Sequence, residues 1–235
     1  MCIRDRTISW PEIRFFNRTG FQMNSVCELY RSTIGKKFVV ALTGSVLFGF
    51  VLGHMTGNLK AFAGVGVDGV HKLDVYAHFL REVGTEMFGH GGLLWIARGV
   101  LLLALLLHVA TIVQLQARNS ASRPVGYKVS KLGAATPASR SMLYGGFAIL
   151  AFVIYHILHM TTGNLHFAGF EEGKVYQNVV NAFGQWHVTL IYAVAMFALG
   201  MHLYHGVWSF CQTVGIDNPE RNAGLRIPVS YTHLT

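Results

Sequence analysis

The sequence predicts an all-α membrane protein, built as an up-down bundle of transmembrane helices. Of its 235 residues, 52% are hydrophobic and only 13% are charged, whereas soluble domains carry about 25% charged residues. Four apolar runs are each long enough to cross a bilayer as a helix, which takes about 20 residues. The segments between these runs alternate in charge, as expected when a chain crosses a membrane back and forth.

The four apolar runs contain neither proline nor acidic residues. Because the bilayer core has no water to satisfy backbone N–H and C=O groups, segments this apolar must be helical there. The expected spans are about Phe38–Leu59, Leu93–Leu115, Met142–Thr162 and His187–Cys211.

The loop charges predict the orientation of the bundle. The loop between the second and third spans is basic without an acidic residue, and basic residues also precede the first span and follow the fourth. The other two loops are mixed or acidic. By the positive-inside rule, the N-terminus, the middle loop and the C-terminal stretch face the cytoplasm, so the four spans run up, down, up and down across the membrane.

Several other classes of protein are excluded by composition. The net charge is +8, but the basic residues lie between apolar runs and form no stripe with aromatic residues, so no nucleic-acid partner is expected. Cys2, Cys27 and Cys211 are far apart and predict no disulfide framework, zinc site or iron–sulfur cluster. Residues 1–30 are irregular and partly non-native in character, 31–216 form the bundle, and 217–235 are a polar tail that looks truncated.

Histidines provide the main functional signal. Polar side chains inside a membrane are costly and usually face the interior of a bundle to serve a function. Of the twelve histidines, His71, His78, His90, His166 and His233 are expected in loops, and His187 at a helix end. Within the spans lie His54, His108, His156, His159, His202 and His205.

Depth in the membrane pairs these histidines. At 1.5 Å per residue, His54 lies roughly 25 Å from the cytoplasmic edge, and His156 and His159 lie roughly 22 and 27 Å from it. On the descending helices, His108 and His202 each lie roughly 22–24 Å from the outer edge. His54 is therefore expected to meet the His156/His159 pair in the outer half, and His108 to meet the His202/His205 pair in the inner half.

Two layers of histidine, each supplied by two helices, suit two haems with imidazole on both axial sides. Such sites carry electrons and leave no open position on the iron. Small residues near the histidines would leave room for a flat macrocycle, although close helix packing explains them equally. A histidine-lined metal transporter is the main alternative from another class, since each His-x-x-His pair places two rings on one helix face.

One sequence repeat bears on the choice of ligand. The first span ends in GHMTGNLKAFAG (Gly53–Gly64) and the third in LHMTTGNLHFAG (Leu158–Gly169). A duplicated core of this length indicates that both helix ends shape the same kind of site. This alignment matches His54 with His159.

The chain resembles the cytochrome b subunit of succinate:quinone oxidoreductases and fumarate reductases of the single-subunit, di-haem b type. The resemblance covers about Arg31 to Ile216. Its matching stretches are RSTIGKKFVVALTGSVLFGFVLGHMTGNL, FLREVGTEMFGHGGLLWIARGVLLLALLLHVATIVQLQARNSASRPVGY, VIYHILHMTTGNLHFAGF and GMHLYHGVWSFCQTVGI. The family has a fifth span after this point, where the present chain has only a short polar stretch.

The resemblance implies a specific set of iron ligands. His54 and His156 would bind the outer haem, and His108 and His202 the inner haem. His159 and His205 fall where other family members tolerate other residues, so they are interpreted as residues that pack beside the ligands.

The resemblance also implies the partners and the direction of electron flow. A flavoprotein and an iron–sulfur subunit would dock on the cytoplasmic face, and electrons would pass through the inner and then the outer haem b to a quinone, menaquinone in type. Glu86 is the candidate proton acceptor for the quinone. The basic rim of Arg31, Lys36, Lys37 and Arg123 would serve docking or haem propionates, although membrane topology alone explains it equally. The related alternative is the di-haem b anchor of a hydrogenase or formate dehydrogenase.

Overall fold

A computed structural model describes residues 28–122, 137–167 and 169–216. Four of its helices are long and apolar enough to cross a membrane: Thr33–Phe62, Gly92–Ala121, Met142–Thr161 and Trp186–Thr213. The fold is therefore an all-α membrane-type helix bundle, as predicted. The N-terminal segment 1–30 and the tail 217–235 fall largely outside the described residues, as does Arg123 of the basic rim. The elements are α2 (Thr33–Asn58), η1 (Leu59–Phe62), α3 (Lys72–Glu82), α4 (Thr85–Phe88), α5 (Gly92–Ala121), α6 (Pro137–His156), a π-helical turn (Ile157–Thr161), α7 (Val175–Phe183) and α8 (Trp186–Thr213).

The long helices extend beyond the apolar runs that predicted them. Helix α2 begins at Thr33, ahead of the expected Phe38, because the side chain of Ser32 accepts a hydrogen bond of 2.9 Å from the Gly35 N–H and so caps the first turn. Helix α5 likewise continues through a polar segment to Ala121. A hydropathy pattern sees only the apolar stretch, whereas the helix continues for as long as its backbone hydrogen bonds are satisfied.

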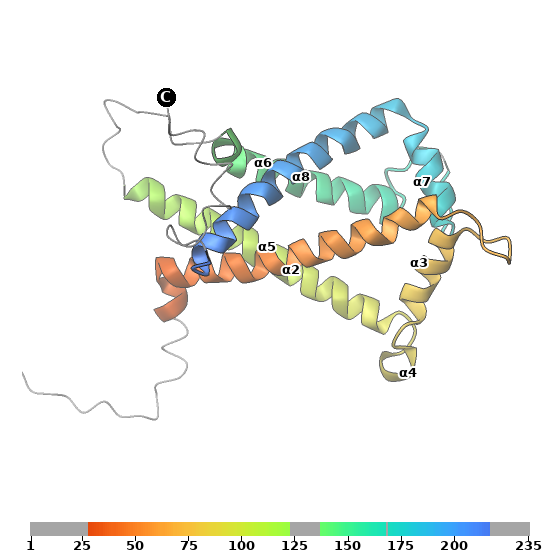
Figure 1. The fold of residues 1–235 in the computed structure, drawn as a ribbon, viewed down its shortest axis with the longest axis horizontal. Coiled ribbons are helices and arrows are strands. Elements are labelled where there is room, and N and C mark those ends of the chain that lie inside the picture. Colours follow the sequence, from red (N-terminus) through yellow and green to blue (C-terminus); the bar gives the residue numbers. More distant parts are fainter. Residues whose placement is uncertain (1–27, 123–136, 168, 217–235) are drawn as a thin grey trace, which may run out of the picture.

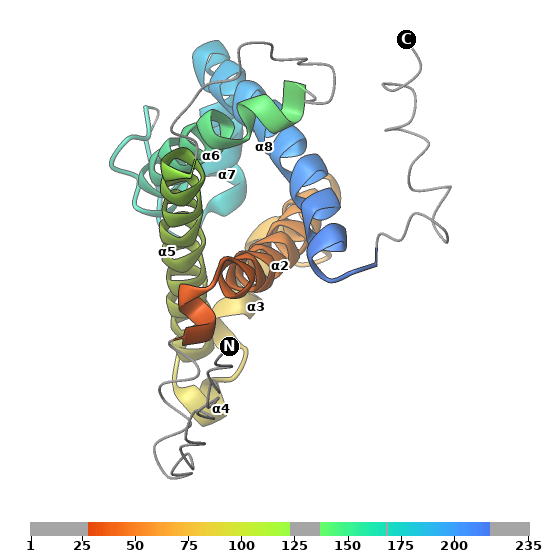
Figure 2. The same ribbon diagram turned by 90° about the vertical axis from the view of Figure 1, so that its left-hand side faces the viewer.

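Helices α2 and α5 pack together, as do α6 and α8, and α2 also contacts α8 (Figure 1). The view along the bundle shows α2 between α5 and α8 (Figure 2). In the most apolar window of each span, at most 17% of the residues are buried within the protein, so most apolar side chains point outward, where a membrane would place lipid. The best-buried cluster, Ala182, Val188 and Tyr192, lies where α7 and α8 meet the end of α6.

Helices α3 and α7 gather at one end of the bundle (Figure 1), called here the α3/α7 end. Both segments were expected to be loops, and His78 accordingly lies in a helix rather than in a loop. The two helices are joined directly, because the backbone N–H of Tyr176 in the first turn of α7 donates a 2.8 Å hydrogen bond to Asp74 Oδ1 of α3. Because these helices are short and partly polar, the hydropathy of the sequence does not reveal them.

The repeated sequence at the ends of the first and third spans has a structural counterpart. A Cβ added at Gly57 would lie 2.6 Å from the Tyr76 ring, and one added at Gly163 would lie 2.5 Å from the Phe170 ring. Both glycines therefore give room to an aromatic side chain from the segment that follows. The terminal glycines of the repeat, Gly64 and Gly169, both have positive φ, at 75° and 64°, a conformation that favours glycine.

Candidate functional site

His54 of α2 and His156 of α6 face each other toward the α3/α7 end. Their ring centroids are 5.8 Å apart and the ring planes are nearly perpendicular, at 86°. In each helix, a phenylalanine four residues earlier stacks on the histidine: Phe50 on His54 at 5.3 Å and Phe152 on His156 at 5.8 Å. Residues four apart are neighbours on one helix face, so the two aromatic rings hold the two imidazoles in matched orientations.

The second histidine of the third span has a different environment from the first. His159 is completely buried, and its ring stacks on Tyr155 at 5.2 Å and on His166 at 5.0 Å. The hydroxyl of Tyr192 lies between the two histidines, 3.1 Å from His156 Nδ1 and 3.0 Å from His159 Nδ1. The structure thus brings His156, and not His159, against His54. Binding of iron by His54 and His156 stays a prediction.

The two ways of aligning the first and third spans are compatible in the structure. The stretches FVLGH (Phe50–His54) and FVIYH (Phe152–His156) match in one register, and the later glycine-containing stretches match in another. Two residues separate His54 from Gly57, whereas six separate His156 from Gly163, and this longer segment includes His159 and the π turn Ile157–Thr161. A π turn closes its hydrogen bonds from i to i+5, so it accommodates about one of the additional residues.

His108 of α5 and His202 of α8 form the second pair, nearer the opposite end of the bundle. His108 and His205 both lie near His202. Thr43 of α2 orients His108, with 3.1 Å between Thr43 Oγ1 and His108 Nδ1. The Thr43 hydroxyl donates its only hydrogen to the Val39 carbonyl, at 2.7 Å, so it accepts from His108 Nδ1–H. The proton of neutral His108 is therefore on Nδ1, and Nε2 keeps a free lone pair.

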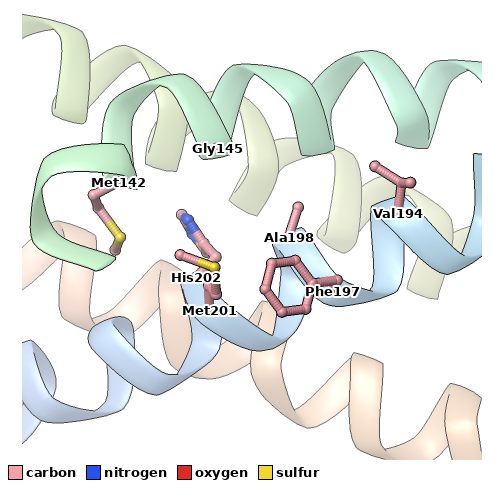
Figure 3. Close-up of a pocket in the computed structure, with 7 residues that line it drawn as sticks. All are labelled: Met142, Gly145, Val194, Phe197, Ala198, Met201 and His202. Carbon is pink, nitrogen blue, oxygen red and sulfur yellow. The ribbon is translucent and has the colours of Figure 1, made fainter. Parts of the chain in front are cut away.

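Small residues surround this second pair. A Cβ at Gly44 would lie 3.3 Å from His108 Cε1, and one at Gly146 would lie 3.6 Å from His202 Cε1. Figure 3 shows His202 pointing from α8 toward α6 beside an apolar cavity. The cavity is lined by Met142, Gly145, Val194, Phe197, Ala198, Met201 and His202.

The two pairs can be tested for their fit to a bis-histidine haem. A metal bonded at about 2 Å to one nitrogen of each ring separates the ring centroids by about 6 Å, and the His54–His156 separation of 5.8 Å agrees with this. At the second pair, His108 has Nε2 free to bind a metal when its Nδ1–H donates to Thr43, and Gly44 and Gly146 leave room beside the two rings. The first pair therefore fits the group by its ring separation, and the second by its available nitrogen and the small residues around it. Among the described residues, no set of three or more His, Cys, Asp or Glu side chains is placed to hold a metal ion.

Two other predicted groups lie elsewhere. Glu86 is exposed in the short helix α4, which packs on α5 (Figure 1). The structure thus does not bring Glu86 to either histidine pair, and its role stays a prediction. The neighbouring Glu82 lies 3.1 Å from His90, measured from Oε1 to Nδ1.

The basic rim is divided between exposed and buried side chains. Arg31 and Lys37 are exposed, whereas Lys36 is 3% exposed, donates to Gln114 Oε1 and lies over the Tyr30 ring. A hydrogen bond with Thr111 and, more weakly, the positive charge of Lys36 lower the pKa of the Tyr30 hydroxyl. Of these three basic residues, only Arg31 and Lys37 can meet a partner at this end.

Sequence reasoning missed three kinds of residue at the site. Thr43 and Tyr192 gave no signal, because a single hydroxyl side chain in an apolar span has many ordinary explanations. Phe50 and Phe152 did give one: the shared pattern Phe-Val-x-x-His precedes His54 and His156 but not His159.

Comparisons of the chain with models of protein families, with curated proteins and with solved structures give no match. The functional conclusion therefore depends on the geometry of the two histidine pairs and on the resemblance carried by the sequence itself.

Proposed function

We propose that the chain is the membrane-anchor cytochrome b subunit of a succinate:quinone oxidoreductase. The observation that carries this proposal is the His54–His156 pair, drawn from α2 and α6 with ring centroids 5.8 Å apart, together with His108 and His202 at a second level of the same membrane-type bundle. His54 and His156 would hold the outer haem b, and His108 and His202 the inner haem b. When bound, these groups would carry single electrons across the bundle between the soluble subunits and membrane quinone.

The surrounding residues of the chain have a definite task in this function. Phe50 and Phe152 keep the rings of His54 and His156 facing each other. Thr43 holds the proton of His108 on Nδ1, which leaves Nε2 as the ligating nitrogen. The apolar cavity beside His202 keeps the surroundings of that histidine free of charge, and low local polarity is one of the means by which proteins set haem potentials.

The orientation and the partners form part of the same proposal. By the positive-inside rule the N-terminus would lie on the cytoplasmic side, and the exposed Arg31 and Lys37 would then face a soluble flavoprotein and an iron–sulfur subunit. The α3/α7 end would face outward, near the outer haem and the site of quinone chemistry.

Co-purification with catalytic reduction tests the function. The full chain, isolated from the cells that naturally produce it and solubilised in mild detergent, should retain a flavoprotein and an iron–sulfur subunit. Addition of succinate should then reduce a b-type haem absorbance. Haem that is reduced by hydrogen or formate but not by succinate would indicate the di-haem b anchor of a hydrogenase or formate dehydrogenase. A chain with no b-type haem spectrum would reject every di-haem b function.

A further inference from the structure

Tyr192 is placed to act on His156 although it comes from a helix that supplies no ligand to the outer pair. Its hydroxyl lies 3.1 Å from His156 Nδ1 and 3.0 Å from His159 Nδ1. The side chain is 8% exposed and is held by edge-to-face contacts with Phe152 and Phe183 at 5.0 and 4.9 Å. Its position is therefore set by packing, independently of the two hydrogen bonds.

The hydrogen bonds through Tyr192 can run in only one direction if His156 is a ligand. An imidazole that binds iron through Nε2 carries its proton on Nδ1, so His156 donates to the Tyr192 oxygen. A tyrosine hydroxyl has one hydrogen, which is then available to His159 Nδ1. The order of donation is thus His156 to Tyr192 to His159.

His159 is suited to accept the last hydrogen bond of this series, from Tyr192, and not to bind iron. Its side chain is completely buried and is fixed between the rings of Tyr155 and His166. With Nδ1 as an acceptor, its own proton lies on Nε2, which has no hydrogen-bond partner among the described residues. Its free lone pair is therefore turned toward Tyr192 and away from His54.

We propose that Tyr192 and His159 are positioning residues that fix the orientation and proton of His156 and thereby set the potential of the outer haem. This inference rests on the proposed function, because it requires His156 to be an iron ligand. Hydrogen bonding of the distal nitrogen makes an imidazole a stronger donor, and a stronger donor stabilises ferric over ferrous iron. The His-x-x-His pair would then consist of one ligand and one residue that acts on it through Tyr192.

The test compares two tyrosine-to-phenylalanine variants in the intact complex. Tyr192→Phe removes the central hydroxyl and keeps the packed ring. Tyr155→Phe is the matched control, because its hydroxyl is also buried in this cluster but has no hydrogen-bond partner among the described residues. The midpoint potential of each haem is measured by optical redox titration, and the ferric signals by low-temperature electron paramagnetic resonance. His159→Phe tests the series from its other end without altering Tyr192.

The expected result is that Tyr192→Phe keeps both haems, raises the midpoint potential of one and shifts its ferric signal, while Tyr155→Phe changes neither potential. His159→Phe should also keep both haems and move the same potential upward by a smaller amount. Unchanged potentials and signals in Tyr192→Phe, or loss of a haem in His159→Phe, would overturn the inference while leaving the di-haem function standing. Absence of haem from the unaltered complex would instead reject the proposed function itself.

Discussion

The two histidine pairs differ in their surroundings, since large aromatic side chains contact one pair and glycines lie beside the other. His54 and His156 lie under stacked aromatic rings, and the buried Tyr192 contacts the far side of His156. His108 and His202 lie against helix backbone at Gly44 and Gly146, with the Thr43 hydroxyl and the Val40 carbonyl as hydrogen-bond partners of His108.

This difference indicates which substitutions each pair can tolerate. The outer pair depends on large side chains that are present, so truncation or loss of a hydroxyl should disturb it. The inner pair depends on side chains that are small, so added volume should disturb it. The two haems should therefore respond separately to matched sets of variants.

The largest expected effect is the loss of one haem at a time. Alanine in place of His54 or His156 should lower the haem content from two per chain to one, and alanine in place of His108 or His202 should remove the other haem. A pyridine haemochromogen assay of purified variants measures this. His205→Ala is the control and should keep both haems. Loss of both haems from every single variant would show that the pairs are not independent.

Added volume should act on the inner pair alone. A Cβ at Gly44 meets His108 Cε1 at 3.3 Å, whereas a Cβ at Gly49 of the same helix meets nothing within 4 Å. Overpacking a filled site costs about 1–3 kcal/mol, so Gly44→Ala should lower the occupancy of the haem that His108→Ala removes. Gly49→Ala should leave the haem content unchanged. Equal effects of the two variants on the haem absorbance spectrum would contradict the close approach of Gly44 to His108.

Thr43 offers a smaller and more selective change. Thr43→Val keeps the shape of the side chain but removes one of the two hydrogen-bond partners of the His108 ring, the other being the Val40 carbonyl, and a hydrogen bond typically contributes about 0.5–1.5 kcal/mol. Both haems should remain, and the potential of the inner haem should rise in a redox titration. Thr43→Ser, which retains the hydroxyl, should restore the original potential. A shift in the outer haem instead would refute this assignment.

The smallest effect is expected where neither pair is touched. Asp74→Ala removes the acceptor for the Tyr176 N–H at the start of α7, and loss of a helix cap costs about 1 kcal/mol. The apparent Tm of the detergent-solubilised protein should fall by about 2–4 °C, with both haem spectra unchanged. Lys174→Ala, which removes only an exposed ion pair with Glu171, should leave Tm where it was. Loss of a haem from Asp74→Ala would contradict this prediction, because it would show that the α3/α7 end is needed for haem binding.

Much of the bundle could be predicted from the sequence because two simple quantities determine it. Hydropathy located the four spans, since a bilayer admits only long apolar helices. The rise per residue placed His54 level with the third-span histidines and His108 level with His202. Helices α3 and α7 were missed because they lie across the bundle end and join through Asp74, a contact between segments far apart in the chain.

The choice between His156 and His159 needed information that composition and depth do not hold. The two residues differ in height by only a few ångströms, and the match of HMTGNL in the first span with HMTTGNL in the third pointed to His159. What separates them is direction around the helix: Phe152 stacks on His156, whereas His159 follows within the π turn and points into the core around Tyr192. Tyr192 itself comes from another helix, so only the folded structure brings it to this place.

Haem stoichiometry of the unaltered chain tests the central claim most directly. The measurement combines iron and haemochromogen content per mole of purified protein with the electron paramagnetic resonance spectrum of the oxidised sample. Two b-type haems per chain, both low-spin with two nitrogen ligands, are the predicted result. No haem, a single haem, or a high-spin signal from iron with an open axial position would contradict the assignment of His54 with His156 and His108 with His202 as two complete ligand pairs.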